Sequence, residues 1–394
     1  MTTPHPALFE IAAGRPADAS NDEAAFLLSC HEHRMVGAAL EANENGQLAL
    51  GAVALETLGI WDLGEQREHL RFWRTHTEVR EALRPLGVEV AVLKGIATEA
   101  RWYDHLGQRV TTDLDLFLDP AALPHVREVI EHLDPAYGPT DPVDWLVRRR
   151  LLPHVDLHVG ATQVDLHFDP LKVGVPIRQL HRAWSTTEEL PTARGTIRVL
   201  SPDVELVLLL LHLNKDRFSY LGPFLDIARI VAWEPLAWDR VAAFVDDEGL
   251  EVPVWMSLAK VADILDLDVP VTRPAGPRAR SWSRLWGTGK GLGGDAGRAA
   301  AKGPQRLLPL HFRGRPGDVL ASLRREFLPH RQLLEVAGRL DHQGSYLRHL
   351  PAATRRHLTA LFDVREVGGT DVQAAAHQAV RPRQSGPETE QDHP

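Results

Sequence analysis

Two aspartates separated by one residue, Asp113 and Asp115, have the residue type and spacing that phosphoryl-transfer chemistry requires. They lie in the alternating segment Asp-Leu-Asp-Leu-Phe-Leu, which predicts a strand. Residues i and i+2 of a strand point to the same face, about 7 Å apart along the chain. Carboxylate oxygens are the ligands that Mg²⁺ prefers, and paired ions stabilise the attacking and leaving oxygens of a phosphoryl displacement. Such a pair can hold two Mg²⁺ ions, although surface strands also alternate apolar and acidic residues; the ordered motifs around it favour the magnesium site.

A near-duplicate motif, Val-Asp-Leu-His, occurs twice farther along the chain, at residues 155–158 and 164–167. The short loop between the copies predicts an antiparallel hairpin. The expected register faces His158 with Asp165 and Asp156 with His167, so that all four polar side chains share one face. Such a row is costly to bury unless its members are bonded or bind metal, which favours a functional face.

A turn at Lys94-Gly95 precedes the two aspartates. The apolar run that ends at Leu93 predicts a strand, and a helix is expected to begin near Ile96. Backbone N–H groups in such a turn attract phosphate, and glycine permits close approach. Because Lys94 adds a positive charge, the turn is expected to bind phosphate.

These motifs resemble the uncharacterised nucleotidyltransferases of the DNA-polymerase-β-like superfamily, sometimes found beside genes for lasso peptides and other modified peptides. The residues that carry the likeness are Leu93-Lys94-Gly95, Arg109 with Asp113-Leu-Asp115, and Val164-Asp165-Leu-His167, with weaker support from Leu211-His212-Leu and Leu225-Asp226-Ile. The motif region spans about residues 86 to 230. In the wider superfamily this turn is usually Gly-Ser, and Lys94-Gly95 stands in its place, as is usual for this family.

The resemblance implies an α+β fold with a polymerase-β-like core, a small mixed sheet with helices, flanked by helical regions at both ends. It implies Asp113, Asp115 and Asp165 as metal ligands, with Asp165 also a general base. Asp156 remains the alternative third carboxylate, and Asp156, His158 and His167 are otherwise expected to orient the metal-binding carboxylates.

Nucleotide contacts are expected at Lys94, Gly95, Arg109, His212, Lys215 and Asp226. For Arg109 the alternative is a simple ion pair with a nearby acid. For the last three, which lie on predicted helices, the alternative is a hydrogen-bonded polar group of the core.

The expected reaction is Mg²⁺-dependent transfer of a nucleoside monophosphate from an NTP, with ATP as the default, to an acceptor hydroxyl. A small molecule, a peptide or a protein is the expected acceptor. Two alternatives remain: a non-catalytic relative that senses nucleotides or binds peptides, and a metal-dependent phosphohydrolase that uses the aspartates and histidines of the hairpin.

The elements that must position these residues fall into seven segments. They are a flexible N-terminus (1–19), a helical region (20–85), the α/β core (86–200), a helical region packing on the core (201–270), a Gly/Arg-rich linker (271–306), a C-terminal helical region (307–365) and a disordered tail (366–394). A helix start is expected at Ser201-Pro202.

Composition limits the partners of this 394-residue chain, whose formal net charge is −9. Long nucleic acid is an unlikely partner, because binding to it is driven by basic charge. No apolar run is long enough to cross a bilayer and no signal peptide is recognisable, so a cytoplasmic protein is expected. The single cysteine, Cys30, is expected in the core. The sequence leaves the oligomeric state open.

Overall fold

The computed structural model describes residues 4–138, 140–171, 177–216 and 218–269. The predictions made for residues 271–306, 307–365 and 366–394 lie outside these described residues.

A six-stranded mixed sheet forms the centre of the fold, with the strand order β3-β4-β2-β1-β6-β5. The strands are β1 (Val90–Val92), β2 (Leu114–Leu118), β3 (His154–Val159), β4 (Thr162–His167), β5 (Glu188–Thr192) and β6 (Gly195–Val199). The pairs β2–β4 and β1–β6 are parallel, and the other neighbours are antiparallel. A mixed sheet flanked by helices confirms the predicted α+β class.

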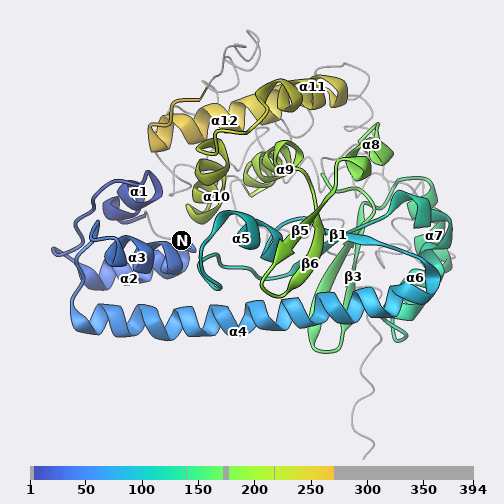
Figure 1. Cartoon of the computed structure of the whole chain (residues 1–394), viewed down its shortest axis with the longest axis horizontal. Helices are drawn as coiled ribbons and strands as arrows, with labels where there is room; N and C mark the ends of the chain where they lie inside the picture. Colours follow the sequence, from blue (N-terminus) through green and yellow to red (C-terminus); the bar gives the residue numbers. More distant parts are fainter. Residues whose placement is uncertain (1–3, 139, 172–176, 217, 270–394) are drawn as a thin grey trace, which may run out of the picture.

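The helices precede, interrupt and follow the strands (Figure 1). They are α1 (Pro6–Ala12), α2 (Glu23–Glu32), α3 (Val36–Glu44), α4 (Ala52–Leu83), α5 (Ile96–Trp102), α6 (Val126–Leu133), α7 (Asp141–Arg148), α8 (Leu180–Ser185), α9 (Pro202–Lys215), α10 (Gly222–Val231), α11 (Trp238–Glu248) and α12 (Glu251–Leu265). Short 3₁₀ helices span Arg84–Leu86 and Pro120–His125. The helix expected near Ile96 and the helix start expected at Ser201-Pro202 are confirmed as α5 and α9.

Helices α4, α6 and α7 cover one face of the sheet. Alternate strand residues, among them Val92 and Leu116, point to this face and pack with Phe72 and Val79 of α4. In Figure 1, α4 runs along one side of the molecule, from the N-terminal helices at one end to α6 at the other. Because α4 covers the sheet, the predicted helical region 20–85 and the core share one packed layer.

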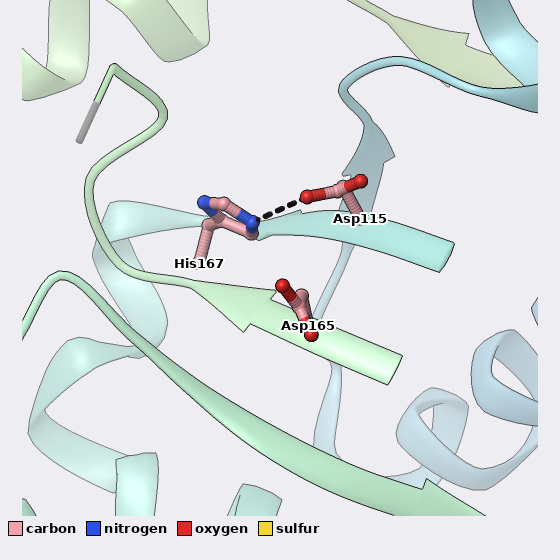
Figure 2. Close-up of side chains that lie close together, drawn as sticks. All are labelled: Asp115, Asp165 and His167. Atoms are coloured by element: carbon pink, nitrogen blue, oxygen red, sulfur yellow. Dashed lines mark hydrogen bonds and ion pairs between the residues drawn. The ribbon is translucent and has the colours of Figure 1, made fainter. Parts of the chain in front are cut away.

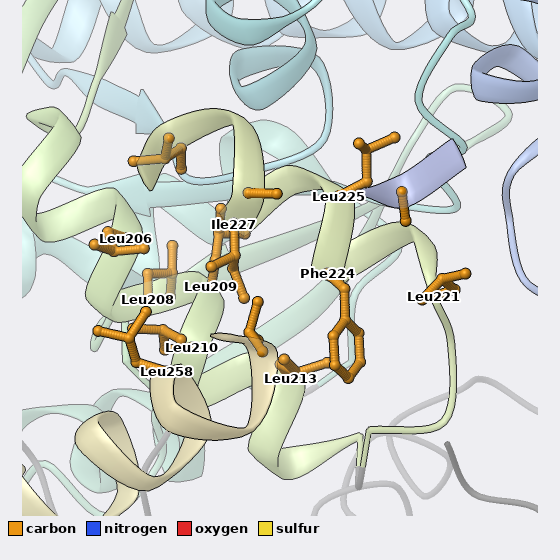
Figure 3. Close-up of a cluster of buried hydrophobic side chains, with 14 of the residues drawn as sticks. Leu206, Leu208, Leu209, Leu210, Leu213, Leu221, Phe224, Leu225, Ile227 and Leu258 are labelled. Carbon is orange, nitrogen blue, oxygen red and sulfur yellow. The ribbon is translucent and has the colours of Figure 1, made fainter. Parts of the chain in front are cut away.

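The other face of the sheet packs against a helical cluster centred on α9. Nearly every side chain of α9 is buried, as expected for a helix that is apolar on all sides. Figure 3 shows leucines of α9 packed against Phe224 of α10 and Leu258 of α12. This cluster includes Ala91, Leu93 and Phe117 of the sheet. Strands β1 and β2 therefore pack against the buried helix α9.

The N-terminal segment corrects one expectation from the sequence. Residues 1–19 were predicted to be flexible, but α1 lies within them, and its Leu8 and Ile11 are buried in the α9 cluster. Helix α1 has only seven residues, too few to be stable as an isolated helix, so it depends on its packing in this cluster.

Two further features concern the single cysteine and the length of the helices. Cys30 is buried, as predicted. Within the described residues, no helix has the length and apolar character that a bilayer crossing requires.

Candidate active site

The adjacent strands β2 and β4 bring two carboxylates and an imidazole together on one face (Figure 2). Their parallel register pairs Asp115 with Asp165, and both side chains are almost fully buried. His167 follows Asp165 by two residues, so it lies on the same face, and its Nε2 donates to Asp115 Oδ1 at 2.9 Å. One ligand atom from each of the three lies within 4.8 Å of the others, a spacing that fits a metal ion.

Lys94 and Asp113 complete this cluster. Asp113 immediately precedes β2, and its side chain is 29% exposed. The Lys94 ammonium lies 2.6 Å from Asp115 Oδ2 and 3.3 Å from Asp113 Oδ1. Burial lowers the pKa of Lys94, but the charges of Asp115 and Asp113 outweigh it and raise that pKa above its usual value. Lys94 is therefore a cation at neutral pH and bridges the two aspartates.

Gly95 forms the turn between β1 and α5, with φ +66° and ψ −114°. An added Cβ would lie 2.8 Å from Thr111 Cγ2, and the positive φ disfavours any other residue. Glycine is thus required here both by backbone conformation and by the close approach of the segment that leads into β2.

Arg109 and Asp226 bind one another beside this cluster. Arg109 Nε lies 3.1 and 3.0 Å from the two Asp226 oxygens, and the Tyr103 hydroxyl donates to Asp226 at 2.6 Å. Arg109 also donates to Thr111 Oγ1 at 3.0 Å, which links the ion pair to the Gly95 turn. The charge on Arg109 is therefore balanced by an acid in this structure, the arrangement foreseen as its alternative role.

A family model described as "Uncharacterised nucleotidyltransferase" matches residues 20–266. The chain belongs to this nucleotidyltransferase family. The match runs from the residues before α2 to the end of α12, so it includes α2, α3 and α4, whereas α1 lies before it. No curated protein and no solved structure matched the chain.

The hairpin of this nucleotidyltransferase has a different register from the one predicted. Asp156 pairs with Asp165 and His158 with Gln163, whereas the sequence suggested His158 opposite Asp165 and Asp156 opposite His167. The reason is the turn: Val159 pairs with Thr162, which leaves a two-residue loop closed by Gly160 at φ +59°. The shift is two residues, so the polar side chains still share one face.

The shift changes which hairpin residues of the nucleotidyltransferase lie near Asp165. His158 is exposed toward the turn, and its backbone N–H donates to Asp134. His154, which the sequence analysis missed, instead pairs with His167, and the two rings stack at 5.4 Å. His154, Asp156 and Asp165 form a second group with metal-ligand spacing. His154 lies two residues before Asp156 in an alternating strand. This spacing was the sequence signal that placed it on the same face.

The remaining predicted contacts of the nucleotidyltransferase lie at the end of α9. His212 is partly buried and Lys215 is exposed. Asp216 follows at the C-cap; burial raises its pKa, while nearby Lys215 and Lys94 lower it. The end of α9 therefore lies within electrostatic range of Lys94. Asp216 is a neighbour of the candidate site that the sequence did not predict.

Proposed function

We propose that this nucleotidyltransferase transfers a nucleoside monophosphate from an NTP, with ATP as the default donor, to an acceptor hydroxyl in a Mg²⁺-dependent reaction. The observation that carries the proposal is the pairing of Asp115 with Asp165 on adjacent strands, with Asp113 beside them. Family membership supports nucleotidyl transfer in general.

Two carboxylates of the converging group suit a hard divalent cation, whereas the imidazole is a softer ligand. Asp115, Asp165 and His167 converge within metal-ligand spacing, and Asp113 lies outside that group at a more exposed position. The Lys94 ammonium between Asp113 and Asp115 supports this fit, because it shows that the carboxylates already accommodate a cation. In our proposal Asp113, Asp115 and Asp165 hold Mg²⁺, which when bound neutralises phosphate charge and polarises the phosphoryl group.

The chain's own residues orient the substrates. Lys94 moves from the carboxylates to the phosphates of the nucleotide, and the Gly95 turn allows those phosphates to approach the backbone. His167 holds Asp115 in place through its 2.9 Å hydrogen bond. Such an orienting contact fixes a carboxylate for metal binding.

In the proposed reaction Asp165 accepts the proton of the acceptor hydroxyl, directly or through water. The acceptor oxygen bonds to the α-phosphorus as the bond from that phosphorus to the bridging oxygen breaks, and pyrophosphate leaves with that electron pair. The acceptor we propose is a small molecule, a modified peptide or a protein side chain, consistent with a role in natural-product biosynthesis.

Calorimetry with the four common NTPs and Mg²⁺ tests this function. We compare the intact chain with Asp113→Asn/Asp115→Asn, and use Asp141→Asn/Asp144→Asn on α7 as a charge-matched control away from the site. We expect the site variant to bind nucleotide at least ~100-fold more weakly, since losing an orienting group alone costs about 10–100-fold in metal affinity. The control variant should bind like the intact chain.

Product analysis distinguishes the alternatives. Pyrophosphate release with a labelled acceptor supports nucleotidyl transfer. Release of inorganic phosphate alone favours a phosphohydrolase built on the hairpin group His154, Asp156 and Asp165. Nucleotide binding that is unaffected by the site variant, with no turnover, favours a non-catalytic nucleotide-sensing relative.

A further inference from the structure

Arg34 lies in the turn between α2 and α3 with a left-handed backbone, φ +60°. For a residue other than glycine this conformation costs about 1–2 kcal/mol and persists only where the surroundings impose it, often at ligand sites. Two backbone bonds impose it here: Met35 N–H donates to Cys30 O at 2.8 Å, and Gly222 N–H donates to His33 O at 2.9 Å. The turn is thus fixed against the start of α10.

The Arg34 guanidinium lies 4.3 Å from the centroid of the Tyr220 ring. Its side chain forms no ion pair with any residue that the structure describes. It lines a pocket together with Gln108, Arg109 and Asp226. Asp226 neutralises the charge of Arg109. The side chains that line the pocket therefore have a net positive charge, which Arg34 supplies.

The pocket adjoins the candidate active site. Arg109 links it to the Gly95 turn through Thr111. The Asp216 carboxyl, at the end of α9, interacts electrostatically with Lys94, Arg34 and Asp113. Arg34 is therefore a cation with no ion-pair partner among the described residues, in a pocket that Arg109 and Thr111 connect to the Gly95 turn, where the proposed function places the triphosphate.

We propose that Arg34, held on Tyr220, binds phosphate oxygens of the nucleotide and of the pyrophosphate released from it. The assignment rests on the proposed function and extends it to the N-terminal helices, which would supply a phosphate contact to the core. A guanidinium suits this role because its fork of N–H donors matches phosphate oxygens in pairs. The aromatic ring restricts the side chain before the ligand arrives.

Binding of Mg²⁺-tripolyphosphate and Mg²⁺-ATP by calorimetry tests the assignment. The variants are Arg34→Gln, which removes the charge, and Arg34→Gly, which also removes the backbone strain. Arg149→Gln is the control, because Arg149 is exposed and lies 4.8 Å from the Trp145 ring, a similar contact outside the cleft. We expect both Arg34 variants to bind both ligands about 10- to 100-fold more weakly, as for loss of one charge-assisted contact.

Thermal unfolding separates a binding role from a structural one. Arg34→Gly should unfold at the temperature of the intact chain or higher, since glycine adopts the left-handed conformation without strain. Reduced affinity with retained stability therefore supports phosphate binding. If Arg34 variants bind both ligands like the intact chain, the assignment is wrong.

Other outcomes separate this inference from the function on which it rests. Weaker ATP binding with unchanged tripolyphosphate binding would assign Arg34 to another part of the nucleotide and overturn the phosphate role. Tripolyphosphate binding that depends on Arg34, in a protein whose ATP binding ignores Asp113→Asn/Asp115→Asn, would retain the phosphate contact and reject the proposed function. Failure of the intact chain to bind either ligand would reject both.

Discussion

The Asp115 carboxylate has a positively charged or hydrogen-bonding group on each oxygen. His167 donates to Oδ1 and the Lys94 ammonium contacts Oδ2, while the side chain is only 1% exposed. A buried ion pair contributes little net stability, but removal of one partner leaves an uncompensated charge. Lys94 is therefore a built-in counterion for the strand carboxylates.

Replacing Lys94 with Met should make stability depend on Mg²⁺. The variant keeps a similar side-chain length but leaves Asp115 buried without its cation, which we expect to cost about 3–5 kcal/mol of unfolding free energy. Added Mg²⁺ should recover much of this loss, because an ion bound only by the folded state stabilises it. Thermal unfolding with Mg²⁺ and with a chelator measures the effect.

Arg74→Met, at an exposed position on α4, is the control for loss of a positive charge. It should leave the Mg²⁺ dependence as in the intact chain. Equal stabilisation of both variants by Mg²⁺ would mean that the ion does not take the place of the Lys94 ammonium.

Close contact between α3 and the segment that follows α5 places the N-terminal helices beside the site. Gly37 on α3 lies so near the backbone that an added Cβ would be 2.3 Å from Gln108 Cα. Gln108 in turn accepts two backbone N–H bonds from residues 104 and 105, which shape this segment. The same segment continues to Arg109 and Thr111, so the contact positions one wall of the candidate site.

A Gly37→Ala substitution should therefore destabilise the protein, because the added Cβ meets the backbone of Gln108, which cannot move aside as a flexible side chain can. Overpacking of this kind costs about 1–3 kcal/mol. Gly59→Ala on α4 is the matched control: its Cβ meets nothing within 4 Å, and alanine should add about 0.5–1 kcal/mol of helix stability. Urea unfolding of both variants should give shifts of opposite sign; two stabilising shifts would mean that α3 is free to move away from Gln108.

The sequence predicted elements best where local pattern and tertiary packing agree. Alternation in residues 113–118 predicted β2, and the change of period at Lys94-Gly95 predicted the turn before α5. The hairpin register was wrong because the repeat fixes which residues share a face, whereas the turn decides which residues face each other. Arg34 carried no sequence signal, since its place depends on packing between distant segments.

Stability of the whole molecule should fall below neutral pH because of His76. This side chain is 2% exposed on α4, and burial, with a smaller effect of Arg80, lowers its pKa to about 4. Between this value and the ordinary 6.5 the unfolded chain binds more protons than the folded protein, so the unfolding free energy decreases as pH falls through that range. The expected loss from His76 is about 3 kcal/mol, complete near pH 4.

Urea unfolding at several pH values between 7 and 4 measures this contribution. His76→Gln cannot titrate, so its stability should decline less steeply than that of the intact chain. His125→Gln, at a site whose side chain is 63% exposed, should follow the intact chain. Identical slopes for all three proteins would mean that the pKa of His76 is the same in the folded and the unfolded protein.

Helix α4 spans about 48 Å, at 1.5 Å for each of its 32 residues. Its first half packs Leu58 into the α9 cluster, and its second half packs Phe72 and Val79 onto the sheet. The two ends therefore belong to different hydrophobic cores. A chain that lacks the residues before about 86 would lose the helix that covers one face of the sheet. Because α4 belongs to both cores, we expect recombination between relatives to exchange the N-terminal helices and the sheet as one block.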